Sequence, residues 1–328
     1  MKINFLKNKK WILFLIIPVL AGLILILFVF KSSPFKEKEK LIAKVGNYEI
    51  FNTDVENKIA FEKCLHRPLD KIRALGILFH NGFLKALADS LNINEETLKT
   101  KEDEEFNLLI KEKRNSFMSI SDEAMRCLEK KFFKKNLNEF YKIAIEPSVL
   151  DKLIYTTFYN SEKIQGPSKN RALKILEEVK KNPDRFEKIA KKEKGIIYRK
   201  IKVVLVKSSE NVNLRDRMRR HFNEVYLNSS SPLYKDVLSK LKPGEIYPEL
   251  YTFLGDVYFQ IIKLAKKEDS TFYVENILIP KKNFYKWQLD YLKNYITIEI
   301  YDKEYCEGMK QLYKDDWFFN LITCKFFK

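Results

Sequence analysis

Between residues 53 and 146 the apolar positions recur three and four residues apart, the spacing of one face of an α-helix. The clearest run has its apolar positions at Ile72, Leu75, Phe79, Phe83, Leu84, Leu87 and Leu91. Thr53, Asn94 and Ser121 each precede such a segment, where a side-chain oxygen can cap the first free amides. The pattern therefore predicts a region of four helices.

A different pattern precedes these helices. The short segments 42–45 and 48–51 are separated only by Gly46 and Asn47. A two-residue linker of this type is typical of a tight β-hairpin turn. We therefore predict two short antiparallel strands directly before the first helix.

From residue 153 onward, segments rich in β-branched and aromatic residues alternate with helical ones. Strands are predicted over 153–160, 196–206, 246–253, 257–264, 272–279 and 296–301. Helices are predicted from Asn170, after Asn182-Pro183, from Pro232 and over 284–292. This part of the chain is expected to form a small α+β unit, followed by a C-terminal section with an aromatic-rich tail.

The segment 11–30 contains twenty residues without a charge, between Lys10 and Lys31. At about 1.5 Å per residue, a helix of this length spans roughly 30 Å, the thickness of a bilayer core. No small-residue cleavage motif follows, so an uncleaved signal anchor is favoured over a removed signal peptide or a buried core helix. With only ten residues before it, we expect the N-terminus inside and the bulk outside the membrane.

Composition and charge restrict the classes of partner and ligand that we expect for this chain. Hydrophobic residues make up 45% of the chain, and 61 Lys and Arg against 44 Asp and Glu give a net charge of +17. A location outside the cytoplasm removes nucleic acid as the partner of this charge, which would instead favour anionic lipid headgroups or acidic polypeptides. A solvated basic surface is the main interpretation. The three histidines, His66, His80 and His221, are far apart, and no common nucleotide-binding, hydrolase or zinc motif occurs, so no cofactor, metal or small-molecule substrate is expected.

The chain has four cysteines and no Cys-x-x-Cys motif. Outside the cytoplasm, Cys64–Cys127 and Cys306–Cys324 are the natural disulfide pairs, although four cysteines allow three pairings. Free buried thiols are an equally weighted alternative.

These features carry a family resemblance. An apolar anchor followed by Ala43-Lys44-Val45-Gly46-Asn47-Tyr48-Glu49-Ile50 resembles the opening of the SurA, PpiD and PrsA group of bacterial extracytoplasmic chaperones, with Gly46 and Asn47 transposed. The segment 172–190 is similar to the helix pair of a parvulin-type prolyl isomerase. Leu241-Lys242-Pro243-Gly244-Glu245-Ile246 and Ile261-Ile262-Lys263-Leu264 resemble the end of that domain.

The resemblance implies an isomerase site whose key residues are missing. The family places one histidine on its first strand (HIL) and another on its last strand (GyHiikL). Here the expected first strand reads Ile154-Tyr155-Thr156-Thr157-Phe158, and Gln260 stands in the place of the second histidine. A glycine-rich motif of the family is also absent between residues 196 and 228. We therefore expect a degenerate parvulin-like domain, with no confident catalytic residue.

The expected fold class is α+β, with an N-terminal transmembrane helix, a mainly helical SurA-N-like chaperone domain, a small α+β parvulin-like domain and an α/β C-terminal section. The expected domains are a stub (1–10), the anchor (11–30), a linker (31–40), the chaperone domain (41–150), the parvulin-like domain (151–267) and a C-terminal section packing back on the N-terminal domain (268–328).

The expected function is that of a chaperone or foldase. One transmembrane helix is expected to anchor it in the bacterial inner membrane, with most of the chain on the extracytoplasmic side. Its partners are unfolded or nascent secreted and membrane polypeptides, with the lipid bilayer contacted through residues 11–30. One alternative is an active parvulin-type prolyl isomerase with a divergent pocket. The other is a membrane-tethered scaffold for envelope assembly.

Overall fold

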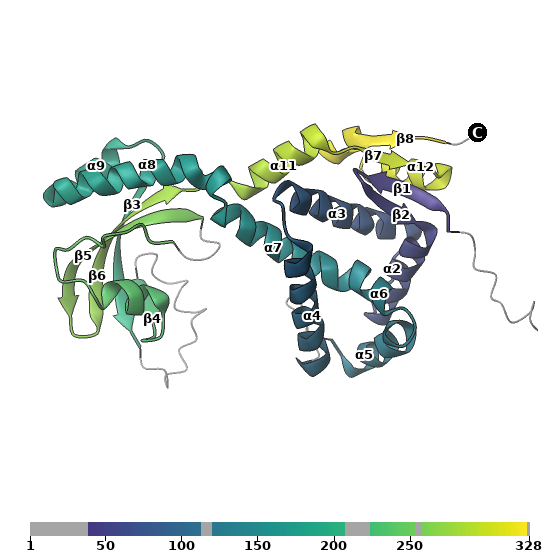
Figure 1. Cartoon of the computed structure of the whole chain (residues 1–328), viewed down its shortest axis with the longest axis horizontal. Helices are drawn as coiled ribbons and strands as arrows, with labels where there is room; N and C mark the ends of the chain where they lie inside the picture. Colours follow the sequence, from purple (N-terminus) through teal and green to yellow (C-terminus); the bar gives the residue numbers. More distant parts are fainter. Residues whose placement is uncertain (1–38, 113–119, 207–223, 253–256, 327–328) are drawn as a thin grey trace, which may run out of the picture.

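The computed structural model describes residues 39–112, 120–206, 224–252 and 257–326. These residues form two units, seen side by side in Figure 1. We call residues 39–160 together with 281–326 the composite unit, because two separated parts of the chain build it. We call residues 161–280 the sheet unit, because a four-stranded sheet forms its centre.

The composite unit contains a four-stranded sheet in the order β2-β1-β7-β8. Its strands are β1 (Leu41–Val45), β2 (Tyr48–Phe51), β7 (Ile298–Ile300) and β8 (Ile322–Cys324). The predicted hairpin forms, with Gly46 at φ +56° in the turn. Strand β7 pairs antiparallel with β1, so the C-terminal section of the chain completes the sheet that the N-terminal hairpin begins.

Helices pack below this sheet around one large hydrophobic core. They are α2 (Asn52–Cys64), α3 (Lys71–Ser90), α4 (Glu95–Glu112), α5 (Asp122–Leu128), α6 (Leu137–Phe140), α7 (Glu146–Asn160), α11 (Phe284–Tyr295) and α12 (Lys303–Leu312), with π-helical turns at Glu129–Phe133 and Tyr141–Ile145 and a 3-10 turn at Trp317–Leu321. As predicted, Asn94 and Ser121 cap α4 and α5.

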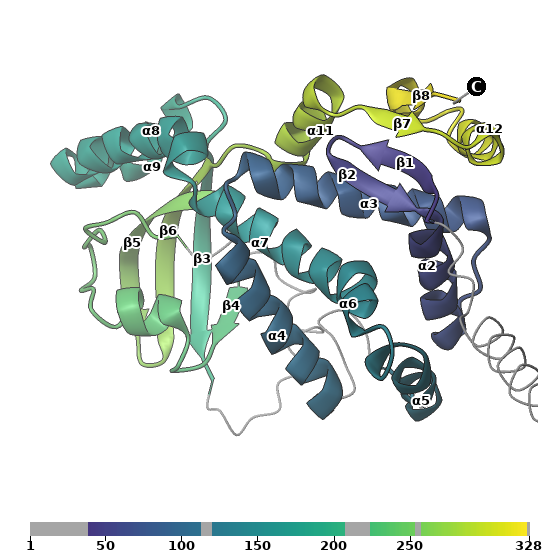
Figure 2. The same cartoon turned by 45° about the vertical axis from the view of Figure 1, so that its right-hand side comes forward.

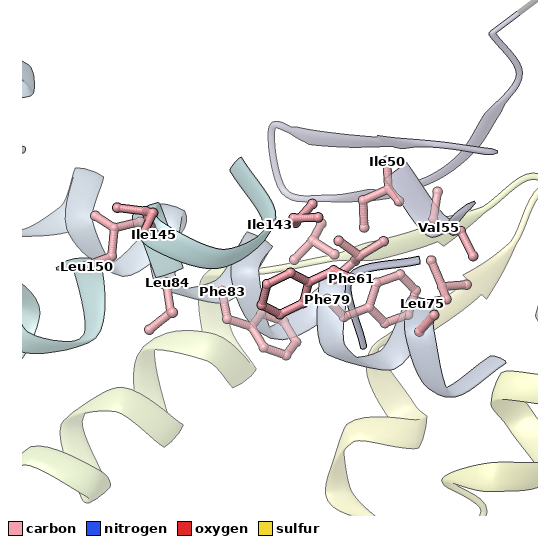
Figure 3. Packing of buried hydrophobic residues seen from close by; sticks show 14 of the residues in the cluster. Ile50, Val55, Phe61, Leu75, Phe79, Phe83, Leu84, Ile143, Ile145 and Leu150 are labelled. Carbon is pink, nitrogen blue, oxygen red and sulfur yellow. The ribbon is translucent and has the colours of Figure 1, made fainter. Parts of the chain in front are cut away.

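The centre of this core is the long helix α3. Its residues Leu75 and Phe79 are fully buried, and Figure 3 shows them among Ile50, Val55 and Phe61 from β2 and α2. Gly82 lies where α3 meets the hairpin, and a Cβ there would stand 2.7 Å from the Cβ of Val45. The absence of a side chain at Gly82 therefore lets the hairpin pack directly on the helix.

The sheet unit has strands in the order β4-β3-β6-β5. They are β3 (Ile197–Leu205), β4 (Glu224–Leu227), β5 (Tyr258–Glu268) and β6 (Thr271–Pro280). Helices α8 (Glu162–Lys181) and α9 (Phe186–Lys192), joined by a 3-10 turn at Pro183–Arg185, pack on one face. A π-helical segment, Leu233–Leu238, packs on the other. Alternate residues of the sheet thus supply two small cores.

Two connections join the units, α7 to α8 through Ser161 and β6 to α11 through residues 281–283. The buried side chain of Gln165 holds them together. Its amide nitrogen donates to the carbonyl of Phe158 at 3.3 Å, and its amide oxygen accepts from the backbone N–H of Lys282 at 2.7 Å. Both connections therefore leave the composite unit at one place.

The strand predicted over 153–160 is wrong, because these residues belong to α7. Phe158 is fully buried and packs against Phe284 and Trp287 of α11, with ring centroids 5.2 and 4.8 Å away. The β-branched and aromatic residues of this segment serve a helix–helix interface, so tertiary packing overrides their strand propensity. Helix α8 also begins at Glu162, before the predicted start at Asn170. The strand predicted over 246–253 is wrong as well, because the described residues of this segment form only isolated bridges, from Ile246 to Lys263 and from Tyr251 to Gln260.

The prediction about the membrane concerns residues 11–30, which lie outside the described residues. Among the helices that the structure does describe, none has the length and apolar character to cross a bilayer. For this part of the chain the fold class is corrected to α+β without a membrane-spanning helix, and the single-pass inner-membrane location that depended on that helix is corrected with it.

Candidate functional site

An open cavity of about 420 Å³ lies on the composite unit between α3, α11 and the turn Trp317–Leu321. Five aromatic side chains line it, namely Phe83, Tyr285, Tyr313, Trp317 and Phe318, and two leucines of α11 add to them. We call this cavity the aromatic groove. Helix α11 lies above α3 in the view of Figure 2, and both helices contribute residues to the lining of the groove.

The aromatic groove has a fixed floor and an exposed rim. The ring of Phe318 packs on Phe83 and Tyr313, with centroid distances of 5.5 and 4.9 Å, and is buried. At the rim, Tyr285 is 74% exposed and Trp317 is 36% exposed. Apolar side chains that gather in one exposed patch are a common mark of a binding surface, so this rim is a candidate contact surface.

A second cavity, of about 640 Å³, also has walls from α3 and α11. We call it the acidic groove, because its lining includes the carboxylates of Glu49, Asp89, Glu95 and Glu146 and the single cation Lys85. Tyr291 and Tyr295 of α11 add aromatic surface, and Tyr295 is 73% exposed.

The polar floor of the acidic groove is built around Tyr48 of the hairpin. The ammonium of Lys85 lies 4.8 Å from the centre of the Tyr48 ring and forms an ion pair with Glu146 at 3.0 Å. Burial, reinforced by the charges of Asp54, Glu146 and Glu139, raises the pKa of Tyr48. The phenol is therefore neutral at physiological pH.

Glu102 of α4 also lies close enough to Glu146 to be affected by its negative charge. Burial and the nearby charge of Glu146 raise the pKa of Glu102 to about 7, against a partial opposing effect of Lys85. Burial and the neighbouring negative charge both disfavour the ionised form of the Glu102 carboxyl group, so both raise its pKa.

In the sheet unit, Gln260 lies beside a second polar side chain. Gln260 of β5 accepts a hydrogen bond from the side-chain amide of Asn276 on β6, at 2.8 Å. Asn276 is 5% exposed. Thus β6 places an amide beside Gln260, whereas the segment 153–160, expected as a strand, is helical.

The expected boundary after residue 267 separates β6 from the rest of the sheet unit, whereas β6 pairs with β5 and β3 in one sheet. The composition of the segment 272–279 indicates a strand and does not indicate its pairing partners, so the position of Asn276 beside Gln260 follows from the sheet pairing alone.

The cysteines are placed in two pairs within the composite unit. Cys64 at the end of α2 forms a disulfide with Cys127 of α5, with Cα atoms 5.5 Å apart. Cys306 of α12 forms the other with Cys324 of β8, with Cα atoms 6.0 Å apart. The first bond thus links α2 to α5, and the second links α12 to β8, the edge strand of the sheet.

The histidines do not form a site. His80 lines the aromatic groove, where burial lowers its pKa, and His66 lies 3.7 Å from the exposed carboxylate of Glu123. His221 lies outside the described residues. Within the described ranges, no group of three or more His, Cys, Asp and Glu is arranged to hold a metal ion.

The chain was also compared with known proteins. No protein-family model matches it, and no curated protein matches it.

Proposed function

We propose that this protein is a nucleotide-independent chaperone that holds non-native polypeptides in the aromatic groove. The observation that carries the proposal is the pairing of a packed aromatic floor with an exposed aromatic rim, formed by Tyr285 and Trp317. Unfolded chains expose apolar side chains that aggregate unless they are covered. A shallow aromatic surface binds such side chains without requiring one sequence.

The geometry fits reversible binding. The groove is open to solvent along one side, so a segment of a client can enter and leave without opening of the fold. Its volume of about 420 Å³ accommodates a few large side chains at a time. Affinity for any one segment is thus expected to be weak, as a holding function requires.

The test measures suppression of aggregation. The full-length chain at stoichiometric ratio should slow the light scattering of a chemically unfolded client. The double variant Tyr285→Ala/Trp317→Ala should lose most of this effect, because both rim rings are removed while the floor stays packed.

The matched control is Phe326→Ala, which removes another exposed aromatic ring, 52% exposed, that lines neither groove. It should suppress aggregation as the wild type does. Equal activity of the rim variant and the wild type would rule out the aromatic groove as the holding surface.

An active prolyl isomerase is the alternative, and the pair Gln260–Asn276 weighs against it, since neither side chain is an imidazole. Uncatalysed isomerisation takes tens to hundreds of seconds, so catalysis is easy to detect in proline-limited refolding. Catalytic amounts of the wild type and of Gln260→His should leave that rate unchanged, because the single change leaves Asn276 in place. Acceleration by the wild type that Gln260→Ala abolishes would favour the isomerase.

A further inference from the structure

The chain carries a net charge of +17, yet the lining of the acidic groove, beside α11, contains four carboxylates and one lysine. Between them, the aromatic and acidic grooves are lined by five carboxylates and one lysine. The carboxylates are those of Glu49, Asp89, Glu95, Glu146 and Asp316, and the lysine is Lys85.

Two of these carboxylates are already neutralised by cations. Glu146 is paired with Lys85 at 3.0 Å, and Glu49 with Lys44 at 2.6 Å. In the described part of the chain, the exposed side chains of Asp89 and Glu95 have no ion-pair partner. The acidic groove therefore retains uncompensated negative charge beside exposed aromatic surface.

Both features lie within reach of one bound segment. Asp89 is on α3 and Glu95 opens α4, and they line the same cavity as Tyr291 and Tyr295 of α11. A lysine or arginine side chain can lay its methylene groups on a tyrosine ring while its charge faces a carboxylate. An acidic client segment would meet repulsion at the same place.

We propose that the two grooves select client segments in which aromatic or aliphatic residues are interspersed with lysine and arginine. The inference rests on the proposed holding function and names its substrate class. The net positive charge of the chain does not oppose such clients at the groove, because salt at about 0.15 M screens charges beyond about 8 Å. The local carboxylates thus decide the preference.

The test uses three fluorescent peptides that share the same phenylalanine and leucine positions. The positions between them carry lysine, glutamine or glutamate. Fluorescence anisotropy with the full-length chain should give the tightest binding for the lysine peptide, by about three- to tenfold over the glutamine peptide, and the weakest for the glutamate peptide. The spread should shrink in about 1 M salt, where the screening length is about 3 Å.

A charge-neutral variant locates the effect. Asp89→Asn/Glu95→Gln should bind the lysine and glutamine peptides about equally. Glu177→Gln/Glu178→Gln, which removes the same charge from exposed positions of α8, should retain the preference.

The outcomes separate the two proposals. Equal binding of all three peptides by the wild type, or a preference that survives Asp89→Asn/Glu95→Gln, would overturn the basic-client inference and leave the holding function standing. Failure of every peptide to bind would overturn the holding function itself. Tighter binding of the glutamate peptide would show that the global charge of +17 governs the client class.

Discussion

The two units differ in which parts of the chain form their hydrophobic cores. The composite unit joins residues far apart in sequence, since β7 pairs with β1 and α11 packs on α7. It has one large core and both disulfides. The sheet unit is continuous in sequence, has two small cores on the faces of one sheet, and includes the hydrogen-bonded amide pair Gln260–Asn276.

The difference bears on function. The grooves that we propose as the client surface lie on the composite unit, where α3 and α11, over 190 residues apart, both contribute lining residues. In the sequence, the sheet unit lies between the two parts of the chain that build this surface. The residues that line the two grooves all belong to the composite unit. Unfolding of the composite unit should therefore abolish client binding, whereas destabilisation confined to the sheet unit should leave client binding unchanged.

The largest expected effect comes from Phe158→Ala in α7. Truncation of a fully buried phenylalanine costs about 3–5 kcal/mol in unfolding free energy. Because Phe158 packs on Phe284 and Trp287, the composite unit alone should lose stability. Thermal unfolding followed by near-ultraviolet circular dichroism should show one transition shifted to lower temperature. An equal shift of every transition would mean that the two units unfold as one.

Removal of the disulfides comes next. The bond Cys64–Cys127 links residues 63 apart, and the chain-entropy account gives about 4 kcal/mol for a loop of this length. The bond Cys306–Cys324 links residues 18 apart and is worth about 3 kcal/mol on the same account. Cys64→Ala/Cys127→Ala should lower the unfolding free energy of the composite unit more than Cys306→Ala/Cys324→Ala. Non-reducing peptide mapping should recover both linked pairs, and alkylation of all four thiols in untreated protein would contradict the assignment.

A smaller effect is expected in the sheet unit from Asn276→Ala. The variant removes the 2.8 Å hydrogen bond from Asn276 to Gln260, and loss of one such partly buried hydrogen bond costs about 1 kcal/mol. Urea unfolding should show a loss confined to the sheet unit, with peptide binding unchanged. The double variant Gln260→Leu/Asn276→Leu should cost less than Asn276→Ala. A larger cost for the double variant would show that Gln260 stabilises the sheet independently of Asn276.

The smallest effect is a pH dependence of the composite unit through Glu102. Its pKa in the folded protein is raised to about 7 from its usual 4.5, so the folded state binds the proton more tightly than the unfolded state. This contribution to stability is present below pH 4.5 and is lost as the pH rises through about 7. Relative to Glu102→Gln, the wild type should lose unfolding free energy between pH 4.5 and 7.5. Parallel profiles of unfolding free energy against pH for the two proteins would contradict the raised pKa of Glu102.

Local features of the chain were largely predictable from the sequence. The hairpin across Gly46, the caps at Asn94 and Ser121, and the strands now seen as β3, β5 and β6 depend on neighbouring residues and on the period of the apolar positions. Interactions between near neighbours are encoded in short windows.

The segment 153–160 shows where that reasoning stops. Its β-branched and aromatic residues favour a strand, but the burial of Phe158 against α11, more than 120 residues later, makes it helical. Likewise the composition of β6 indicated a strand and did not indicate which sheet it would enter. Pairing between β5 and β6 decided that Asn276 faces Gln260.

Residue types and local spacing are enough to predict the α+β mixture of elements, the positions of the turn and of two helix caps, and the basic balance of the chain. Packing of distant segments places the two ends of the described chain in one sheet, brings α3 and α11 together at the aromatic groove, and gathers carboxylates in the neighbouring acidic groove. A groove and its electrostatic field are sums over residues distant in sequence, so they arise only when the fold brings those residues within reach of one another.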